Sequence, residues 1–432
     1  MEPTRETFGN IPDSSVALFY VLTVVTLAIF ASGVWRRFRM WRQGQPVDVY
    51  RLFTGGLKAA WAKAGPGLRR LLTEGLGQQR VRGRGLAGIA HVVLFAGFMM
   101  LLLGTTMLEI DHIAGMISPR LHFHHGTYYV VYEFTLDVFG LLFLAGCSWF
   151  LWRRTRRPAS LGHRATDWYV LLSFLSIGVT GYILEALRIT WQHPTGLGAK
   201  CSPVGLALAQ FLFSGLGDTG ARAAHLGVWW VHALLVFGFI ATIPHTRLLH
   251  FLAGPLNLFL AAPSLGQLRP VTMEEVEKTE RIGVSDIRHL TQQQLLSLDA
   301  CMECGRCEEA CPAFATGKPL SPKRVVQDLR GLMERTLGRG AQPEAPALHE
   351  QTIDAETLWS CTTCSACVNV CPVRIDQVAL MVDMRRHLVS EGGLSGTAAT
   401  ALRRLQSAAN PWGLPAADRA EWTKALNPPP PS

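Results

Sequence analysis

Eight of the ten cysteines in this 432-residue sequence fall into two short repeats with the same spacing, Cys-x₂-Cys-x₂-Cys-x₃-Cys-Pro. The repeats consist of Cys301, Cys304, Cys307 and Cys311 before Pro312, and of Cys361, Cys364, Cys367 and Cys371 before Pro372. Cysteine thiolates are soft ligands that select zinc, copper(I) or iron–sulfur clusters. Ten cysteines are also too few for the disulfide scaffold of a secreted chain of this length. The repeats therefore indicate metal chemistry.

The spacing favours two [4Fe–4S] clusters. It is the run of bacterial two-cluster ferredoxins, in which three cysteines wrap one cubane and the fourth ligates the other cluster. We therefore assign Cys301, Cys304, Cys307 and Cys371 to cluster 1, and Cys361, Cys364, Cys367 and Cys311 to cluster 2. Two zinc sites are the alternative, but zinc would leave the Cys-Pro ending of each repeat without a clear role.

The two repeats begin 60 residues apart, further than in a compact ferredoxin. The insert predicts a helix at Pro322–Leu337, so this part is similar to the helical ferredoxin domains of respiratory subunits. The two remaining cysteines, Cys147 and Cys201, are expected to be packing or surface residues.

The rest of the sequence is unusually apolar. Hydrophobic residues make up 49% of the chain and charged residues 17%, with a mean hydropathy of +0.20, which disfavours a purely soluble globule or a disordered chain. A bilayer core needs about 20 apolar residues per helix. Five stretches meet that length and predict membrane spans: Ser15–Trp35, Leu86–Leu108, Tyr128–Trp152, Asp167–Leu187 and Ala224–Ile243. We expect the first to be a span that stays in the protein and not a cleaved signal peptide. Buried helices of a large soluble protein are the alternative.

Basic residues set the predicted orientation. The net charge of +9 comes largely from arginines that flank alternate ends of the spans, a pattern typical of cytoplasmic loops and not of nucleic-acid binding. These flanks are Arg36, Arg37 and Arg39; Arg80, Arg82 and Arg84; and Arg153, Arg154, Arg156 and Arg157. We therefore expect a multi-pass protein of the inner membrane, with its N-terminus outside and its cysteine repeats in the cytoplasm, where disulfides do not persist. The segment Val49–Leu76 suits either an interfacial helix or a solvated connecting helix.

Three histidines inside or beside the spans need an explanation, because unpartnered polar groups are costly in a membrane. His91 near the start of the second span and His250 after the fifth are expected at similar depth, as a bis-histidine b-type haem requires. His232 precedes His250 by 18 residues, which on one continuous helix is about 27 Å along the same face. That interval would place a second haem toward the outer surface.

These features carry a family resemblance. The five spans, His91, His232 and the stretch from Pro244 to Pro255 resemble the cytochrome b (gamma) subunit of respiratory nitrate reductase. Over residues 16–422 the chain is similar to cytochrome b plus ferredoxin proteins related to heterodisulfide reductase and to membrane-bound flavoprotein:menaquinone oxidoreductases. The resemblance implies that His91 and His250 bind a proximal haem b and that His232 gives one ligand to a distal haem b.

The sequence departs from that family at two places. Leu101 stands where the nitrate reductase pattern has a second histidine in the second span, so the distal haem lacks an obvious second ligand. His225, His124 or His125 could substitute, or a single haem is present. Near the C-terminus, residues 410–414 and 419–422 resemble the segment that leads into a cysteine-rich CCG domain in fused relatives, and we expect that module, where it exists, on a separate polypeptide.

The predicted fold is an all-α membrane bundle of five transmembrane helices that binds haem b, joined to a cytoplasmic α-helical 2[4Fe–4S] ferredoxin domain. The predicted parts are a cytochrome b domain at 1–262, a linker at 263–290 with the boundary near Ser264–Pro270, the ferredoxin domain at 291–392, and a C-terminal helix with a disordered Pro-rich tail at 393–432. His245, His122, His124 and His125 are more simply explained as surface or interfacial residues.

Haems and iron–sulfur clusters are one-electron carriers. No dinucleotide-binding glycine motif and no pairing of nucleophile with base stands out in the sequence. We therefore expect a membrane oxidoreductase subunit that passes electrons between the quinone pool, with menaquinone as the expected quinone, and a separate CCG-type or flavin-containing partner. Two alternatives are a haem-and-cluster wire without its own quinone site and a haem-free iron–sulfur sensor. Five acidic residues in or beside the spans, Glu109, Asp111, Glu133, Asp137 and Glu185, suit either proton transfer or structural ion pairs.

Overall fold

The computed structural model describes residues 4, 7–46, 64–156, 165–194, 196–261, 268–338 and 347–426. Within these ranges the chain is helical, and extended pairing is limited to three isolated bridges. Three parts of the sequence predictions lie outside the described residues. They are residues 49–63 of the predicted interfacial or connecting helix, residues 264–267 of the predicted domain boundary, and the predicted tail at 427–432.

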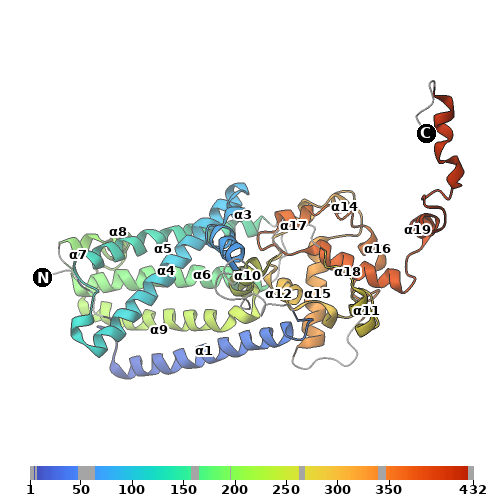
Figure 1. The fold of residues 1–432 in the computed structure, drawn as a ribbon. Helices are drawn as coiled ribbons and strands as arrows, with labels where there is room; N and C mark the ends of the chain where they lie inside the picture. The colour runs from blue at the N-terminus through green and yellow to red at the C-terminus, as the bar shows by residue number, and fades with distance from the viewer. Residues whose placement is uncertain are drawn as a thin grey trace.

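Five long helices form a bundle, seen lengthwise in Figure 1. They are α1 (Asp13–Trp41), α4 (Gly85–Ile117), α5 (Gly126–Thr155), α6 (Ala165–Gln192) and α9 (Asp218–Thr242). All five are long and apolar enough to cross a membrane. The five predicted helices are therefore confirmed, and four of the predicted spans lie wholly inside them.

The fifth predicted span ends one residue beyond α9, and one inference from it is wrong. Helix α9 stops at Thr242 because Pro244 has no N–H to continue the ladder, and two short 3₁₀ turns follow. His250 is instead the first residue of a separate helix, α10 (His250–Leu260). His232 and His250 therefore do not share one face of a continuous helix.

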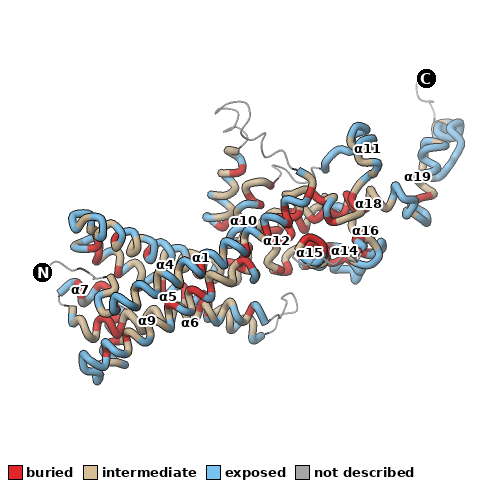
Figure 2. Tube along the Cα trace, turned by 90° about the horizontal axis from the view of Figure 1, so that it is seen from below, coloured by how far each residue is buried: buried red, intermediate tan, exposed pale blue. Residues whose placement is uncertain are grey.

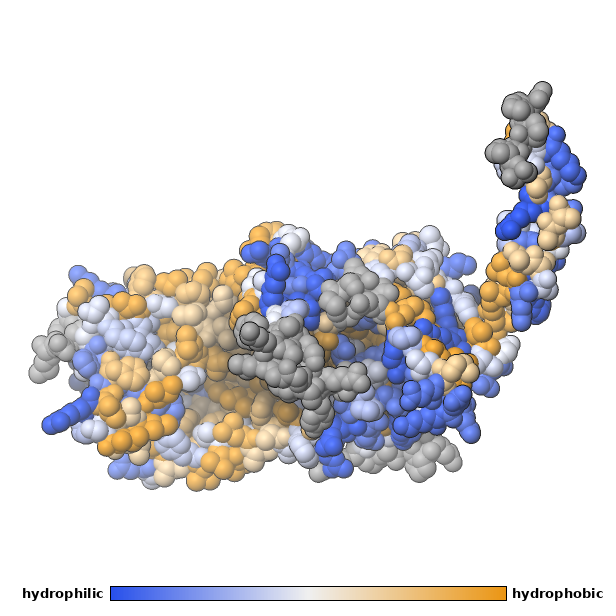
Figure 3. All heavy atoms as spheres, in the orientation of Figure 1, coloured by the Kyte–Doolittle hydropathy of each residue, from blue (hydrophilic) through white to orange (hydrophobic). Residues whose placement is uncertain are grey.

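Helices α4 and α5 pack closely because glycines lie at their contact. A Cβ on Gly97 would lie 2.7 Å from the Cβ of Phe143, and one on Gly146 would lie 2.8 Å from the Cβ of Leu94. Small residues of this kind let membrane helices approach each other. The face of the bundle seen in Figure 3 is largely apolar, and side chains such as Val24 and Leu86 are 67% and 72% exposed. An exposed apolar surface along membrane-length helices fits contact with lipid.

The cysteine-rich part lies at one end of the bundle, the end at which α1, α5 and α9 finish and α4 and α6 begin (Figure 1). Its helices are α11 (Met273–Thr279), α12 (Gln292–Ala300), α13 (Arg306–Glu309), α14 (Pro312–Ala315), α15 (Pro322–Leu337), α16 (Ala355–Trp359), α17 (Ala366–Val370) and α18 (Gln377–Ser390). Helix α15 has the predicted bounds, because Ser321 caps its N-terminus and Pro322 occupies its first turn. Beyond it, α19 (Gly396–Ala408) extends away from the body.

Short elements fill both ends of the bundle. At the cysteine-rich end lie a π-helical segment, Leu71–Leu76, the turn α3 (Gln79–Arg82) and α10. At the opposite end α7 (Leu197–Lys200) and α8 (Pro203–Leu212) lie beside α5 and α6.

The two parts share a core instead of meeting through a loose linker. Met40, Trp41, Leu249 and Ala253 of the bundle end belong to the same buried cluster as the leucines of α12 and α15. Figure 2 shows the buried residues concentrated in the cysteine-rich part and at this junction. The junction is therefore packed like a protein interior.

A buried ion-pair network crosses this junction. Arg37, assigned above to a basic flank, is 4% exposed, and its guanidinium lies 2.6 Å from Glu334 and 3.3 Å from Asp299. Asp299 also accepts a 2.8 Å hydrogen bond from the indole of Trp41 and pairs with Arg330 at 3.0 Å. The carboxylate of Asp299 thus holds the end of α1 against α12 and α15.

Replacing Asp299 should destabilise the protein strongly. Asp299→Ala leaves the buried guanidinium of Arg37 and the partly buried one of Arg330 without this partner, and breaking a buried pair in this way costs about 3–5 kcal/mol. The expected result is a lower denaturation midpoint in detergent, followed by circular dichroism. Glu421→Ala, which breaks an exposed pair with Lys424, is the control and should cost about 0–1 kcal/mol. Equal effects of the two substitutions would contradict the role of Asp299.

Candidate functional site

The two cysteine repeats adopt the same unusual backbone. The third and fifth residues of each repeat have positive φ: Glu303 (56°) and Gly305 (79°) in the first, Thr363 (55°) and Ser365 (60°) in the second. Residues with side chains seldom adopt this conformation. Such residues next to right-handed ones turn successive N–H groups into a concave surface, which is common at phosphate and iron–sulfur sites. Both loops are therefore shaped to hold an anionic group.

The fold brings cysteines of the two repeats near one another. Cys371 lies within electrostatic reach of Cys301 and Cys304, and Cys307 lies within reach of all three and of Cys367. In the other group Cys367 interacts with Cys361, Cys364 and Cys311. Helices α13 and α17 pack against each other, so the two groups are neighbours.

Backbone N–H groups point at some of these sulfurs. Ile375 donates to Sγ of Cys371 at 3.3 Å, and Thr363 donates to Sγ of Cys361 at 3.4 Å. Burial nevertheless raises the pKa of the Cys371 thiol to about 12 and that of Cys301 to about 11. These two thiols are therefore protonated at neutral pH without metal, and metal binding must release their protons.

Among the described residues, no three His, Cys, Asp or Glu side chains lie close enough together to hold a single ion. A cubane attaches each thiolate to a different iron, so its four ligand sulfurs stand further apart than the ligands of one zinc ion. The donor set and its spacing fit clusters.

A cavity of about 1420 Å³ runs through the bundle. This exceeds the roughly 300–1,000 Å³ of a pocket for one drug-sized ligand. At one end its wall includes Cys304, Arg306 and Pro372, and at the other Glu185 and Arg188. The cavity therefore connects the first cysteine repeat with the far end of the bundle.

The three predicted haem ligands, His91, His232 and His250, all line this cavity. Nδ1 of His91 lies 2.8 Å from Oε1 of Gln78, Nδ1 of His250 lies 2.6 Å from the carbonyl oxygen of Arg247, and Nδ1 of His232 lies 2.8 Å from Oγ1 of Thr180. Metal-bound histidines commonly donate their second ring nitrogen in this way, which fixes the ring and leaves Nε2 as the ligand.

His91 and His250 form the better pair. They lie on different helices, α4 and α10, 159 positions apart in the sequence, yet both line the same cavity. Gln78 holds His91 from the turn that leads into α3, and Arg247 holds His250 from the turn that leads into α10. The residues present therefore fit a group that needs two axial imidazoles.

The other histidines differ in their surroundings. His225 lines the far end of the cavity, and Asn10 lies 3.4 Å from its Nδ1. His124 is buried against the ring of Tyr132 at 4.3 Å, and it is absent from the described cavity wall, as is His125. His245 is exposed. Leu101, at the position of the missing family histidine, lines the cavity.

Arg247, whose carbonyl oxygen lies beside His250, also forms ion pairs that reach a cysteine loop. These ion pairs were not evident from the sequence. The guanidinium of Arg247 lies 2.8 Å from Glu303, in the first repeat, and 3.0 Å from Asp167 on α6. The sequence analysis included Arg247 only as part of the stretch from Pro244 to Pro255. No sequence pattern indicated that Gln78 or Thr180 would contact a histidine. Their partners lie far away along the chain.

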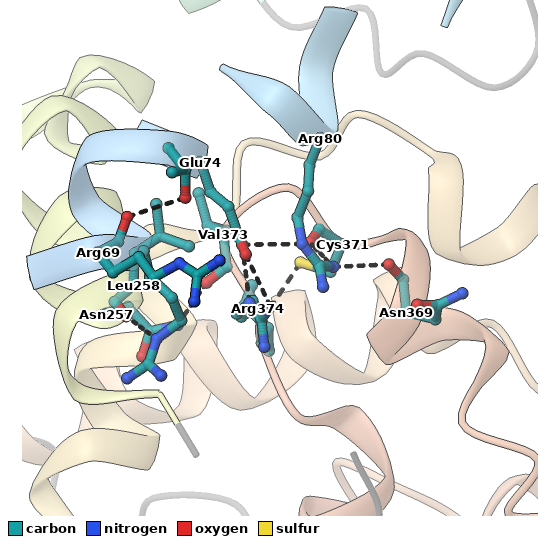
Figure 4. A network of polar contacts seen from close by, with 12 residues as sticks. Arg69, Glu74, Arg80, Asn257, Leu258, Asn369, Cys371, Val373 and Arg374 are labelled. Carbon is teal, nitrogen blue, oxygen red and sulfur yellow. Dashed lines mark hydrogen bonds and ion pairs between the residues drawn. The ribbon is translucent and has the colours of Figure 1, made fainter. Parts of the chain in front are cut away.

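A second set of contacts surrounds Glu74 (Figure 4). Glu74 accepts two 2.7 Å bonds from Arg374 and pairs with Arg80 at 2.8 Å. Burial favours the protonated carboxyl, but Arg374 and Arg80 hold the pKa of Glu74 below its usual range. Arg80 also donates to the carbonyl oxygen of Cys371 at 3.2 Å, and Asn257 donates to that of Val373 at 2.7 Å. The loop of Cys371 is thus fixed to α10 and to the segment that carries Gln78.

Comparison with known proteins agrees with the cysteine chemistry. Residues 297–375 match the 4Fe-4S dicluster domain. The chain is 30% identical over 457 positions to the EtfAB:quinone oxidoreductase of Syntrophomonas wolfei, which covers 97% of this chain and 61% of that protein. It is 31% identical over 450 positions to the "Probable membrane-anchored ferredoxin" of Chromohalobacter salexigens, which covers 95% of this chain and 58% of that protein.

A shorter match reaches one subunit of the dihydromethanophenazine:CoB--CoM heterodisulfide reductase of Methanosarcina barkeri, at 33% identity over 146 positions, 32% of this chain and 35% of that protein. The chain spans about three fifths of the length of its first relatives, 61% and 58%. No solved structure matches. The chain is thus related to membrane-anchored iron–sulfur oxidoreductases, as predicted, and the resemblance to the nitrate reductase gamma subunit stays a prediction.

The crossed arrangement predicts which cysteine substitutions share a phenotype. Cys371→Ser should remove the same electron paramagnetic resonance signal as Cys301→Ser, and Cys311→Ser the same signal as Cys361→Ser. Each variant should lose about four of about eight irons. Cys147→Ala, in the bundle core, is the control and should keep all iron. A loss of the same signal in Cys311→Ser and Cys301→Ser would contradict the crossing.

Proposed function

We propose that this chain is a membrane-bound electron-transfer oxidoreductase subunit that links a soluble redox partner to the quinone pool, with menaquinone as the expected quinone. Its carriers are two [4Fe–4S] clusters, in the assignment given above, and a b-type haem on His91 and His250. These groups supply one-electron chemistry when bound. The carrying observation is that both imidazoles, each oriented through Nδ1, line a cavity whose wall includes Cys304.

The positions of the two cysteine groups support an order for the clusters. Met302, Glu303 and Cys304 of the first repeat line the cavity that holds His250. In the second group, by contrast, Cys364 is exposed at the surface. Cluster 1 is therefore the one next to the membrane site, and cluster 2 is the one that meets the soluble partner.

A second haem at His232 has weaker support. Thr180 orients this imidazole toward the cavity, but a bis-histidine haem needs a second ligand from the opposite side. His225 lies seven residues earlier on the same helix, so it stands on the same side as His232. We therefore propose one bis-histidine haem, with His232 as the remaining candidate for a distal haem.

The proposed location follows from charge. The end of the bundle with the cysteines carries Arg80, Arg84, Arg153 and Arg154, and the positive-inside rule makes that end cytoplasmic. One relative is named for EtfAB and quinone, which fits a soluble partner on one side and quinone on the other. A CCG-type or flavin-containing protein is the partner we propose for cluster 2.

Quinol should reduce the haem of the purified chain directly. With menadiol as the electron donor, the b-type absorption bands are expected to appear without any added protein. A chain that contains haem but is not reduced by quinol would support a wire without a quinone site. A preparation that contains both clusters but no haem in a pyridine haemochrome assay would contradict the haem proposal itself.

Removing one proposed haem ligand should remove haem and leave the iron–sulfur clusters in place. His91→Ala takes away the imidazole that Gln78 orients, so at least one haem should be lost while about eight cluster irons remain. His245→Ala, at an exposed histidine of the same end, is the matched control and should keep all haem. Full haem occupancy in His91→Ala would rule out this ligand assignment.

A further inference from the structure

The far end of the cavity holds a group of polar side chains that the proposed carriers do not use. Arg188 is 4% exposed, and its guanidinium binds both carboxylate oxygens of Glu185, at 2.5 and 3.0 Å. It also donates to Oε1 of Gln192 at 2.7 Å and lies 4.0 Å from Glu133. All four residues line the cavity on membrane-spanning helices. Ionisable groups at such positions are rare and usually functional.

A neighbouring indole carries a donor with no acceptor in the part of the chain that the structure describes. Nε1 of Trp191 is buried and makes no hydrogen bond within the described residues, although the indole lines the cavity. The ring is held in place, because Arg222 lies over it at 4.1 Å and His225 packs on it at 6.2 Å. An unsatisfied buried N–H costs free energy unless a ligand or water accepts from it.

The nearby acidic residue Asp137 has a structural task instead. Its carboxylate accepts from the backbone N–H groups of Val204 at 2.9 Å and Gly205 at 3.3 Å, at the start of α8. Asp137 therefore anchors α8 beside the cavity. Glu185, Arg188 and Trp191 are the polar groups at this end on which the inference rests.

The cavity is open to the apolar surface of the bundle. Leu102 and Ile110 of α4 line it and are 50% and 45% exposed. On the other side it is lined by Phe19 and Tyr20 of α1, and Tyr20 donates to Glu109 at 2.9 Å. A ligand with an apolar tail can therefore reach the cavity from the lipid between α1 and α4.

We infer that this end of the cavity binds the headgroup of an isoprenoid quinone, an inference that rests on the proposed function. The indole of Trp191 and the guanidinium of Arg188 donate to the ring oxygens, and Glu185 exchanges the proton of the quinol hydroxyl. The overall step is quinone + 2 e⁻ + 2 H⁺ = quinol, with the electrons exchanged through the chain with the soluble redox partner. The site lies at the end of the bundle remote from the cysteines and from the His91–His250 pair. The inference therefore also requires the distal haem for which His232, one helical turn from Glu185, is the candidate ligand.

The test compares two oxidants of the chemically reduced, cofactor-loaded protein. Menadione needs the proposed site, whereas ferricyanide takes electrons without one. Glu185→Gln removes the proton carrier, whereas Trp191→Phe removes the unpartnered N–H together with part of the ring but leaves an aromatic ring beside Arg222, so the second variant should fold even if the first does not. Each should slow reoxidation by menadione about tenfold or more at low menadione concentration, and Glu185→Gln should also flatten its pH dependence.

Reoxidation by ferricyanide should stay unchanged in both variants. Asp218→Asn is the matched control, because this carboxylate pairs with His193 at the same end of the bundle but is exposed. Normal menadione kinetics in both Glu185→Gln and Trp191→Phe would overturn the inference and leave the proposed function standing. Failure of the unaltered protein to react with menadione would count against the proposed function itself.

Discussion

The ion pair between Arg247 and Glu303 is the contact on which the proposed electron path depends. Electrons move efficiently only between carriers that are held close together, so the cysteine loops must keep a fixed position against the membrane bundle. Arg247 achieves this from one short turn: its side chain binds the first cysteine repeat and α6, while its carbonyl oxygen accepts the ring N–H of His250. One residue therefore positions a cluster loop and a candidate haem ligand together.

The same physical requirement explains why charges at the junction are buried in pairs. Arg37, Asp299 and Glu74 lie where two parts of the chain meet, and each has at least two partners of opposite charge. A buried charge is tolerated only when it is paired and hydrogen-bonded. The junction is therefore held by paired charges as well as by its shared apolar cluster.

The bundle itself follows a simpler rule. Its outer face is apolar because it meets lipid, and its inner polar groups gather along the cavity, where they can serve a ligand. The acidic residues noted in the sequence separate into two roles on this basis. Asp137 anchors α8 through backbone N–H groups, while Glu185 faces the cavity together with Arg188.

Features that depend on local spacing could be predicted from the amino-acid order alone. Cysteine spacing and apolar run length predicted the cluster motif and the five long helices, and the helix at Pro322–Leu337 was also predicted, because each of these features is local in the sequence. The supports of the histidines and the joining of the two parts emerged from the folded chain instead. Gln78, Thr180 and the Arg37–Asp299 pair act across gaps of 13 to 262 positions, and such contacts leave no periodic trace in the sequence. The break after α9 was missed for a related reason: the hydropathy of the run continues past Thr242, but Pro244 ends its hydrogen bonding.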